Sequence, residues 1–300
     1  MNVKPVISGI IVLALAAFPL FGFDTLIEEA DEAHGDERYE ESMELLDEAY
    51  NAASFNSQRA EVAWRRARTN LSMVDRDLAA ETISDSEAID RLEQGERYAE
   101  EAVGYNERLA EGWFWHAANK GRRGQVRGVL NSLFMASDVR DLAMEAIERD
   151  EDMTEPYFLL GVMYRELPGG FISFGDDQKA VSLARLAVDR HEQDRRQGEV
   201  DDVWYNYYIE LAHNLHERNW SESRRNRRQS GIRSDYESAD ENIDRAFNYE
   251  GTVSLPSGSD RDEAMELIQW VISEIRGLDS PTQGQLDDLA EAEELYDDWN

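Results

Sequence analysis

Apolar residues recur along most of this chain at the three- and four-residue spacing that places them on one face of an α-helix. Two clear examples are residues 39–53, YEESMELLDEAYNAA, and residues 262–278, DEAMELIQWVISEIRGL. Few stretches alternate apolar and polar residues as a half-buried strand does, and the 300 residues include only six prolines. The pattern predicts an all-α chain.

The helical pattern is organised in pairs, and the pair within residues 156–188 shows this most clearly. Its first helix resembles the tetratricopeptide consensus W-x2-L-G-x2-Y at four positions: Tyr157, Leu160, Gly161 and Tyr164. Its second helix carries small residues at the matching places: Ala180, Ala184 and Ala187. Tyr164 and Ala180 lie sixteen residues apart, against about nine in a standard repeat. The turn between them, which includes LPGGFIS at 167–173, is therefore predicted to be enlarged.

Comparable pairs occur on both sides of this unit, at about residues 25–50, 61–106, 111–150 and 208–247. Small residues allow close approach between helices, and large residues of one helix fill the gaps of the next. A single pair cannot bury its apolar face, so the pairs must stack. We therefore predict an all-α, tetratricopeptide-like helix-pair solenoid with enlarged turns inside the repeats. It should comprise four to five pairs in residues 23–258 and two C-terminal capping helices in residues 259–300.

The last of these pairs contains the longest predicted insertion. Its first helix is expected around residues 208–216 and its second at 238–247, SADENIDRAF. Between them lies the Arg-rich segment 224–233, RRNRRQSGIR, which is predicted to be a loop paired with neighbouring carboxylates; a docking site for an acidic partner is the alternative. Residues 251–259, GTVSLPSGS, have the composition of a linker.

The first 22 residues differ from the rest of the chain. Lys4 precedes an apolar run from Val6 to Phe18, and small residues follow near Gly22. This layout is typical of a secretory signal peptide that is cleaved from the mature protein. The alternative is an uncleaved N-terminal membrane anchor, because the run is nearly long enough to span a bilayer. Either reading predicts a periplasmic or secreted protein.

The charge of the chain is extreme. Sixty-four Asp and Glu residues face 31 Lys and Arg residues, for a formal net charge of −33. Nucleic acid and anionic membrane surfaces are therefore not expected partners. Only three lysines occur, and an acid-rich, lysine-poor surface suits high salt, where screening weakens self-repulsion. The chain has no cysteine, which excludes disulfides, thiol catalysis, Cys-ligated metal and lipidation at a lipobox.

The chain resembles the repeat domain of the regulator-of-microtubule-dynamics-like proteins over roughly residues 61–190. The resemblance rests on the order and spacing of EVAWRRAR, ERYAEEAVGYNERLAEGWFWHAANKG and LNSLFMASDVRDLAMEAIERDEDMTEPYFLLGVMYRELPG. Bacterial relatives include the T component of TRAP transporters, TatT. The resemblance implies a secreted repeat protein that docks a periplasmic solute-binding protein, forms homo-trimers and has a cleft or pore lined by apolar side chains.

Aromatic residues are the candidate ligand- or partner-binding residues. They recur on the predicted first helices and in the enlarged turn: Trp113, Trp115, Tyr157, Tyr164, Phe171, Phe174, Trp204 and Tyr208. First helices of such a solenoid line its concave face, but these rings could equally be core wedges between repeats. The core reading is favoured for Tyr157 and Tyr164, which occupy consensus positions. Trp113 and Trp115 are two residues apart on a helix and point to different faces, so one of them is a candidate for the cleft.

No motif for catalysis, metal or cofactor binding stands out. His213 and His216 lie three residues apart on one helical face, but a third ligand is not evident, and a surface pair is the favoured reading. No phosphate loop or Gly-x-Ser-x-Gly motif is present. We therefore expect a non-enzymatic binding protein that docks a TRAP solute-binding protein and can hold an apolar or amphipathic organic acid. The alternative is an envelope scaffold without a small-molecule ligand.

Overall fold

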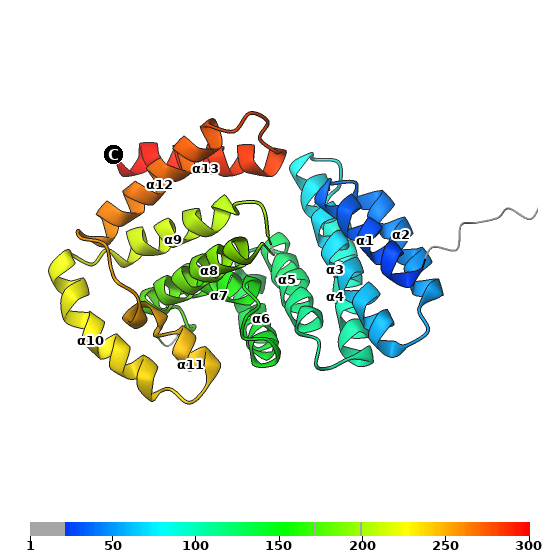
Figure 1. Cartoon of the computed structure of the whole chain (residues 1–300), viewed down its shortest axis with the longest axis horizontal. Helices are drawn as coiled ribbons and strands as arrows, with labels where there is room; N and C mark the ends of the chain where they lie inside the picture. Colours follow the sequence, from blue (N-terminus) through cyan, green and yellow to red (C-terminus); the bar gives the residue numbers. More distant parts are fainter. Residues whose placement is uncertain (1–21, 171, 199) are drawn as a thin grey trace, which may run out of the picture.

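The computed structural model describes residues 22–170, 172–198 and 200–300, and these residues are helical almost throughout (Figure 1). Apart from Gly22, the predicted signal segment lies outside the described residues. The first eight helices form four consecutive pairs: α1 (Phe23–Gly35) with α2 (Tyr39–Ala52), α3 (Asn56–Ala79) with α4 (Asp85–Tyr105), α5 (Ala110–Val126) with α6 (Val129–Arg149), and α7 (Glu155–Glu166) with α8 (Asp177–Gln197). The prediction of an all-α helical-repeat solenoid is confirmed.

The pairs stack side by side in a curved row from α1 and α2 at one end to α9 (Tyr205–Arg218) at the other (Figure 1). Each second helix packs against its own first helix and against the first helix of the next pair. The first helices also contact one another in succession, from α3 through α5 and α7 to α9. This arrangement gives the solenoid one continuous face built mainly by first helices.

Small residues allow the helices to approach closely, as the sequence pattern requires. Ala63, Ala67, Ala99 and Ala117 are all fully buried between α3, α4 and α5. Gly95 shows how tight the approach is, because an added Cβ would collide with the side chain of Asn119. The interlocking of small and large side chains explains why the repeats form one packed row.

The α7–α8 turn, Leu167–Asp176, is enlarged as the sixteen-residue spacing predicts. Gly169 and Gly175 form an isolated β-bridge, and an added Cβ at Gly175 would collide with the carbonyl oxygen of Leu167. Asp176 then caps α8 by accepting hydrogen bonds from the backbone N–H groups of Gln178 and Lys179. The glycines thus close the turn and the aspartate restarts the helix.

The extra length of two other repeats lies in their helices, which corrects the prediction of enlarged turns there. Only residues 127–128 separate α5 from α6, and residues 80–84 separate α3 from α4. Residues 124–134 therefore contain the end of α5 and the start of α6, with no enlarged turn between them.

The predicted second helix of the last pair is wrong. Residues 238–247 contain only the five-residue α11 (Asn242–Ala246), and α9 instead packs against α12 (Asp260–Arg276). The α12 helix offers α9 a much longer apolar face, with buried Ala264, Ile268, Val271, Ile272 and Ile275. The Arg-rich segment is not a loop: it lies within α10 (Glu222–Ser238), which packs against the short 3-10 turn η1 (Tyr249–Thr252).

The C-terminus ends the stack with α12 and α13 (Gln283–Trp299). A capping box at Ser259 starts α12, and the helix ends at Gly277, as its sequence predicts. The α13 helix packs on α12 and α9, with Ala292 as its one fully buried side chain. Within the described ranges, no helix combines the length and apolarity needed to cross a membrane.

Six buried charges join α8, α9, α10, η1 and α12. We call them the buried ion cluster: Arg185, Arg218, Arg225, Glu250, Asp260 and Glu263. Arg218 donates to Asp260 at 2.8 and 2.9 Å and to Glu250 at 2.9 Å. Arg185 grips Glu263 with two hydrogen bonds of 2.7 and 2.8 Å. Three guanidinium groups balance three carboxylates, so the cluster holds the inserted α10 to the stack without net charge.

Candidate functional site

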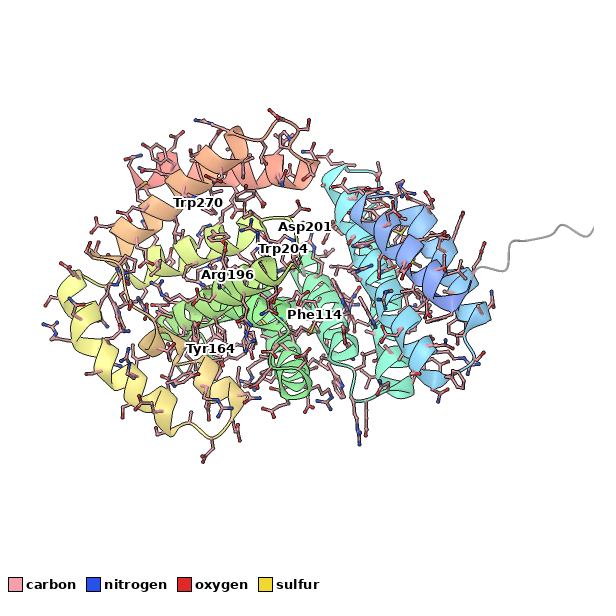
Figure 2. All side chains as sticks on the ribbon, in the orientation of Figure 1. Phe114, Tyr164, Arg196, Asp201, Trp204 and Trp270 are labelled. Atoms are coloured by element: carbon pink, nitrogen blue, oxygen red, sulfur yellow. The ribbon has the colours of Figure 1, made fainter. Side chains whose placement is uncertain are left out.

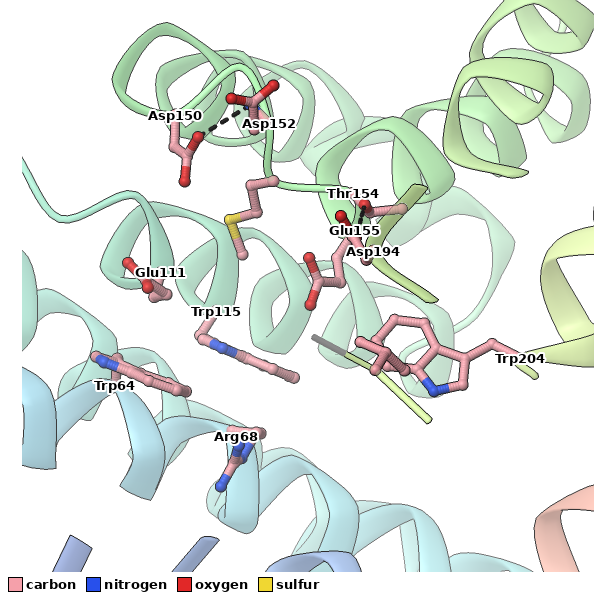
Figure 3. Close-up of a pocket in the computed structure, with 12 residues that line it drawn as sticks. Trp64, Arg68, Glu111, Trp115, Asp150, Asp152, Thr154, Glu155, Asp194 and Trp204 are labelled. Atoms are coloured by element: carbon pink, nitrogen blue, oxygen red, sulfur yellow. Dashed lines mark hydrogen bonds between the residues drawn. The ribbon is translucent and has the colours of Figure 1, made fainter. Parts of the chain in front are cut away.

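An open cleft of about 370 Å³ lies where the first helices α3, α5 and α7 meet the end of α8 and the segment before α9. Three tryptophans line it: Trp64, Trp115 and Trp204. Five carboxylates and one guanidinium also line it: Glu111, Asp150, Asp152, Glu155, Asp194 and Arg68. We call this site the tryptophan–carboxylate cleft. In Figure 3 the three indole rings form a row, and the carboxylates lie along one side of that row.

The stacked repeats place Trp64 and Trp115 next to each other on α3 and α5. Trp64 is buried, its Nε1–H donates to Glu61 at 2.9 Å, and the guanidinium of Arg65 lies 4.1 Å from its ring centroid. Trp115 is partly buried and packs edge-on against Phe114, with centroids 4.9 Å apart. Because Arg65 already covers Trp64, Trp115 is the more accessible ring at this end of the cleft.

Trp204 closes the other end of the cleft and is held by the residues around it. Its ring stacks on His191 with centroids 5.0 Å apart, and its backbone N–H donates to Nε2 of His191 at 3.0 Å. Tyr207 packs edge-on against both rings. Nε2 of His191 must be unprotonated to accept this hydrogen bond. Burial lowers the pKa of His191, which favours the neutral imidazole. The indole is therefore fixed in orientation before any ligand arrives.

Three carboxylates occupy the inner part of the cleft. Glu111 and Glu155 lie in the first turns of α5 and α7, and Asp194 lies near the end of α8. Asp194 accepts a hydrogen bond of 3.3 Å from the hydroxyl of Thr154. Among the described residues, none of these three carboxylates forms a salt bridge. All three are partly buried, whereas Asp150 and Asp152 lie exposed at the rim.

Burial raises the pKa of Glu155 above its ordinary value, and the nearby charges of Glu111 and Asp194 raise it further. Burial also raises the pKa of Glu111, with Glu61 and Asp150 adding to the effect. Burial is the larger cause of both shifts, and the repulsion between neighbouring carboxylates adds to it.

Arg68 forms its salt bridge with Asp31 and not with these three carboxylates, and its charge acts on Glu155 only at longer range. It donates to Asp31 of α1 at 2.6 Å, a carboxylate that also receives hydrogen bonds from Arg65. Burial lowers the pKa of Arg68, and the neighbouring Asp31 acts against that shift. The tryptophan–carboxylate cleft thus combines aromatic surface with an excess of negative charge.

Of the seven candidate aromatic residues that the structure describes, two line this site, Trp115 and Trp204. Trp113 points away from it: its Nε1–H donates to the carbonyl of Glu107 at 2.9 Å, and Arg149 stacks on its ring. Phe171 lies outside the described residues. Phe174 packs against Tyr164, with centroids 5.1 Å apart.

The three tyrosines among the candidates are core residues. Tyr157, Tyr164 and Tyr208 are all less than a tenth exposed and belong to the main apolar cluster around α7, α8 and α9. Tyr164 lies at the opposite end of the α7–α8 pair from Trp204 (Figure 2). These rings wedge successive repeats apart at a fixed distance and do not reach the cleft.

The histidine pair and the Arg-rich segment have structural partners. His216 stacks on Trp299 with centroids 4.1 Å apart, and His213 approaches Glu291 at 3.4 Å, so both hold α13 on α9. Over the described ranges, no three His, Asp or Glu residues gather closely enough to hold a metal ion. In α10, Arg225 is buried in the ion cluster, whereas Arg224 and Arg228 are exposed near the ring of Trp220.

Residues 26–167 match the family model described as "Regulator of microtubule dynamics protein 1-3". This range runs from α1 to the end of α7 and contains Trp64, Trp115, Glu111 and Glu155. The match supports a relationship between this part of the chain and that repeat family. Asp194 and Trp204, which complete the cleft, lie beyond the matched range. No curated protein matches the chain.

Proposed function

We propose that this protein acts by binding, with the tryptophan–carboxylate cleft as its recognition site. The observation that carries the proposal is the convergence of Trp115, Trp204, Glu111, Glu155 and Asp194 from three separate repeats. Burial raises the pKa values of Glu111 and Glu155, and none of the three carboxylates forms a salt bridge in the described parts of the chain, so a cationic ligand can relieve their repulsion.

The proposed partner is a periplasmic solute-binding protein of a TRAP-type transporter. This part of the proposal rests on the resemblance to TatT and on the signal-like segment at residues 1–22. Helical-repeat solenoids present extended surfaces built from successive repeats, which suits the docking of another folded protein. A homo-trimer and a location outside the cytoplasm belong to the same proposal.

The ligand class implied by that resemblance fits the cleft poorly. An organic acid would place its carboxylate among Glu111, Glu155 and Asp194, with Arg68 already bound to Asp31. Like charges repel one another more strongly in a partly buried site than in open water. The charge of the cleft therefore favours a ligand or partner group that is positive.

A scaffold without a small-molecule ligand is the second candidate function. The observation in its favour is that several of the candidate aromatic residues fill the core, as Tyr157, Tyr164 and Tyr208 do. A scaffold also needs no enclosed chamber, and the cleft is open to solvent with polar as well as apolar lining.

A pull-down of the native envelope with tagged protein tests the docking proposal. Wild-type protein and the control Trp113→Leu should both recover a solute-binding protein, because Trp113 lies outside the cleft. The double variant Trp115→Ala, Trp204→Ala should recover much less. Equal recovery by all three would support the scaffold function, and failure to recover any solute-binding protein would reject the TRAP assignment.

A further inference from the structure

We infer that the tryptophan–carboxylate cleft binds an organic cation, specifically a group carrying a substituted ammonium. The inference deepens the proposed function and rests on the cleft being the binding site. It names the ligand chemistry, which neither the family match nor the resemblance supplies.

The aromatic side chains of the cleft are of a type and in a position that suit a cation. A cation is attracted to the face of an aromatic ring, and tryptophan gives the strongest attraction. Trp115 and Trp204 both line the cleft and both remain partly exposed. Trp204 has one ring face covered by His191 and is fixed by the hydrogen bond to that imidazole. A ring held in place loses little entropy when a ligand binds to it.

Negatively charged carboxylates lie around these rings. Glu111, Glu155 and Asp194 converge on the cleft from three helices without a salt bridge in the described ranges, and Arg68 is occupied by Asp31. A cation placed among them gains attraction from three carboxylates at once and lowers their mutual repulsion. A neutral apolar ligand would gain none of this.

The size of the site favours an organic cation over a metal ion. Metal ions need several ligand oxygens within about 2.0–2.6 Å of one point. No such gathering occurs in the described residues. A cleft of about 370 Å³ instead accommodates a group of several heavy atoms. Alkylated ammonium ions are large and weakly hydrated, so aromatic walls can replace their water at little cost.

The substituted ammonium could belong to a free small molecule or to a basic side chain of the docked partner. Both sources present a cationic ammonium to the rings and carboxylates, but a lysine ammonium is compact and more strongly hydrated than the quaternary ammonium of choline. Choline serves as the probe for a free solute, and N-acetyl-lysine amide serves as the probe for a protein side chain. The neutral compound 3,3-dimethylbutanol has the shape of choline without its charge, so it isolates the contribution of the charge.

Isothermal titration calorimetry at low ionic strength, on the full mature chain, provides the test. We expect saturable binding of choline or of N-acetyl-lysine amide, and binding of 3,3-dimethylbutanol at least about tenfold weaker than that of choline. Trp204→Ala and Glu155→Gln should each weaken binding of the cation about fivefold or more. Trp113→Leu and Glu294→Gln are the matched controls outside the cleft and should leave it unchanged. Circular dichroism verifies that each variant is folded.

Three results would overturn the inference: equal binding of choline and 3,3-dimethylbutanol, binding of neither ammonium probe, or full retention of affinity in both cleft variants. The docking proposal fails separately. Cation binding without recovery of a solute-binding protein leaves the inference intact and rejects the TRAP partner. Recovery of a solute-binding protein without binding of either ammonium probe supports the docking proposal and overturns the inference.

Discussion

The tryptophan–carboxylate cleft and the buried ion cluster both gather charges from distant parts of the chain, but they treat those charges in opposite ways. In the cluster, burial alone would raise the pKa of Glu250 and Glu263, yet the adjacent arginines outweigh it and hold both pKa values below the ordinary range. In the cleft, burial and neighbouring carboxylates raise the pKa of Glu111 and Glu155, and neither forms a salt bridge with an arginine in the described residues.

The difference separates a structural use of charge from a functional one. A charge-balanced cluster of ion pairs holds α10 against α8, α9 and α12, and each of its carboxylates is paired with an arginine. In the cleft, Glu111, Glu155 and Asp194 form no salt bridge within the described residues, and the proposed cationic ligand would lower their mutual repulsion. In an acid-rich chain, abundance of Asp and Glu carries no information about function, but the absence of a matching arginine does.

The largest expected effect comes from breaking the buried ion cluster. Arg218→Met leaves Glu250 and Asp260 buried without their main partner. Removing one member of a buried charge pair typically costs about 3–5 kcal/mol. Urea unfolding measures the loss, with Arg227→Met, an exposed arginine of α10, as the matched control. A loss no larger than that of the control would show that the cluster does not stabilise the fold.

Salt should raise the free energy of unfolding through the exposed carboxylates and leave the contribution of the buried ion cluster unchanged. The net charge of −33 predicts that the free energy of unfolding rises as NaCl screens repulsion among exposed carboxylates. The Debye length falls from about 10 Å at 0.1 M to about 3 Å at 1 M. Arg218→Met should show the same rise as wild type, since its charges are shielded from the solvent. No gain in stability with salt would count against the high-salt adaptation expected from the sequence.

The two regions should also respond to pH with opposite signs. A carboxyl with a raised native pKa binds protons more tightly when folded, so stability rises as pH falls towards the ordinary pKa of glutamate, about 4.3. A carboxyl with a lowered native pKa loses its stabilising effect as pH falls further, through that lowered pKa. Wild-type protein should therefore gain a little stability below neutral pH and then lose it steeply below about pH 4.

Thermal melts of wild type and of the double variant Glu111→Gln, Glu155→Gln between pH 3 and 8 check this sign. Asp288, whose pKa burial raises to about 6, titrates in the same direction elsewhere, so the difference between the two proteins is the informative quantity. The difference in Tm should shrink by about 2–4 °C as pH falls from 7 towards 4.5. A difference that stays constant over this range would contradict raised pKa values in the cleft.

The smallest expected effect on stability is that of Glu155→Gln alone. Replacing an unpaired, repelled carboxylate with a neutral isostere should leave the free energy of unfolding within about 0.5 kcal/mol of wild type, or slightly above it. Urea unfolding at pH 7 is the measurement. A loss above about 2 kcal/mol would mean that Glu155 has a structural partner and stabilises the fold, as the carboxylates of the buried ion cluster do.

The repeat architecture could be predicted from the sequence because its signals are local. Apolar periodicity, consensus positions such as Gly161 and caps such as Asp176 and Ser259 each act within one helix pair. The partner of α9 could not be predicted in the same way. The segment 238–247 has suitable alanine spacing, but α12 follows an insertion and wins by burying a longer apolar face.

The cleft was largely beyond prediction because its residues meet only after the repeats stack. Trp115 and Trp204 were two of eight candidate aromatics, the sequence did not decide between Trp113 and Trp115, and Trp64 was not a candidate. Glu111, Glu155 and Asp194 are three among 64 acidic residues, and nothing in their local sequence shows that arginines elsewhere leave them unpaired. Helix-start positions for Glu111 and Glu155 were the one available signal, and first-turn acids are too common to single them out.

The most direct test of the account is a carboxyl NMR titration of Glu155 and Glu263 in the presence and absence of saturating choline, with the Gln variants providing the assignments. In the free protein, the pKa of Glu155 should lie above about 4.3 and that of Glu263 below it. Choline should lower the pKa of Glu155 and leave that of Glu263 unchanged. An ordinary pKa for Glu155 in the free protein, or one that choline does not move, would contradict the account.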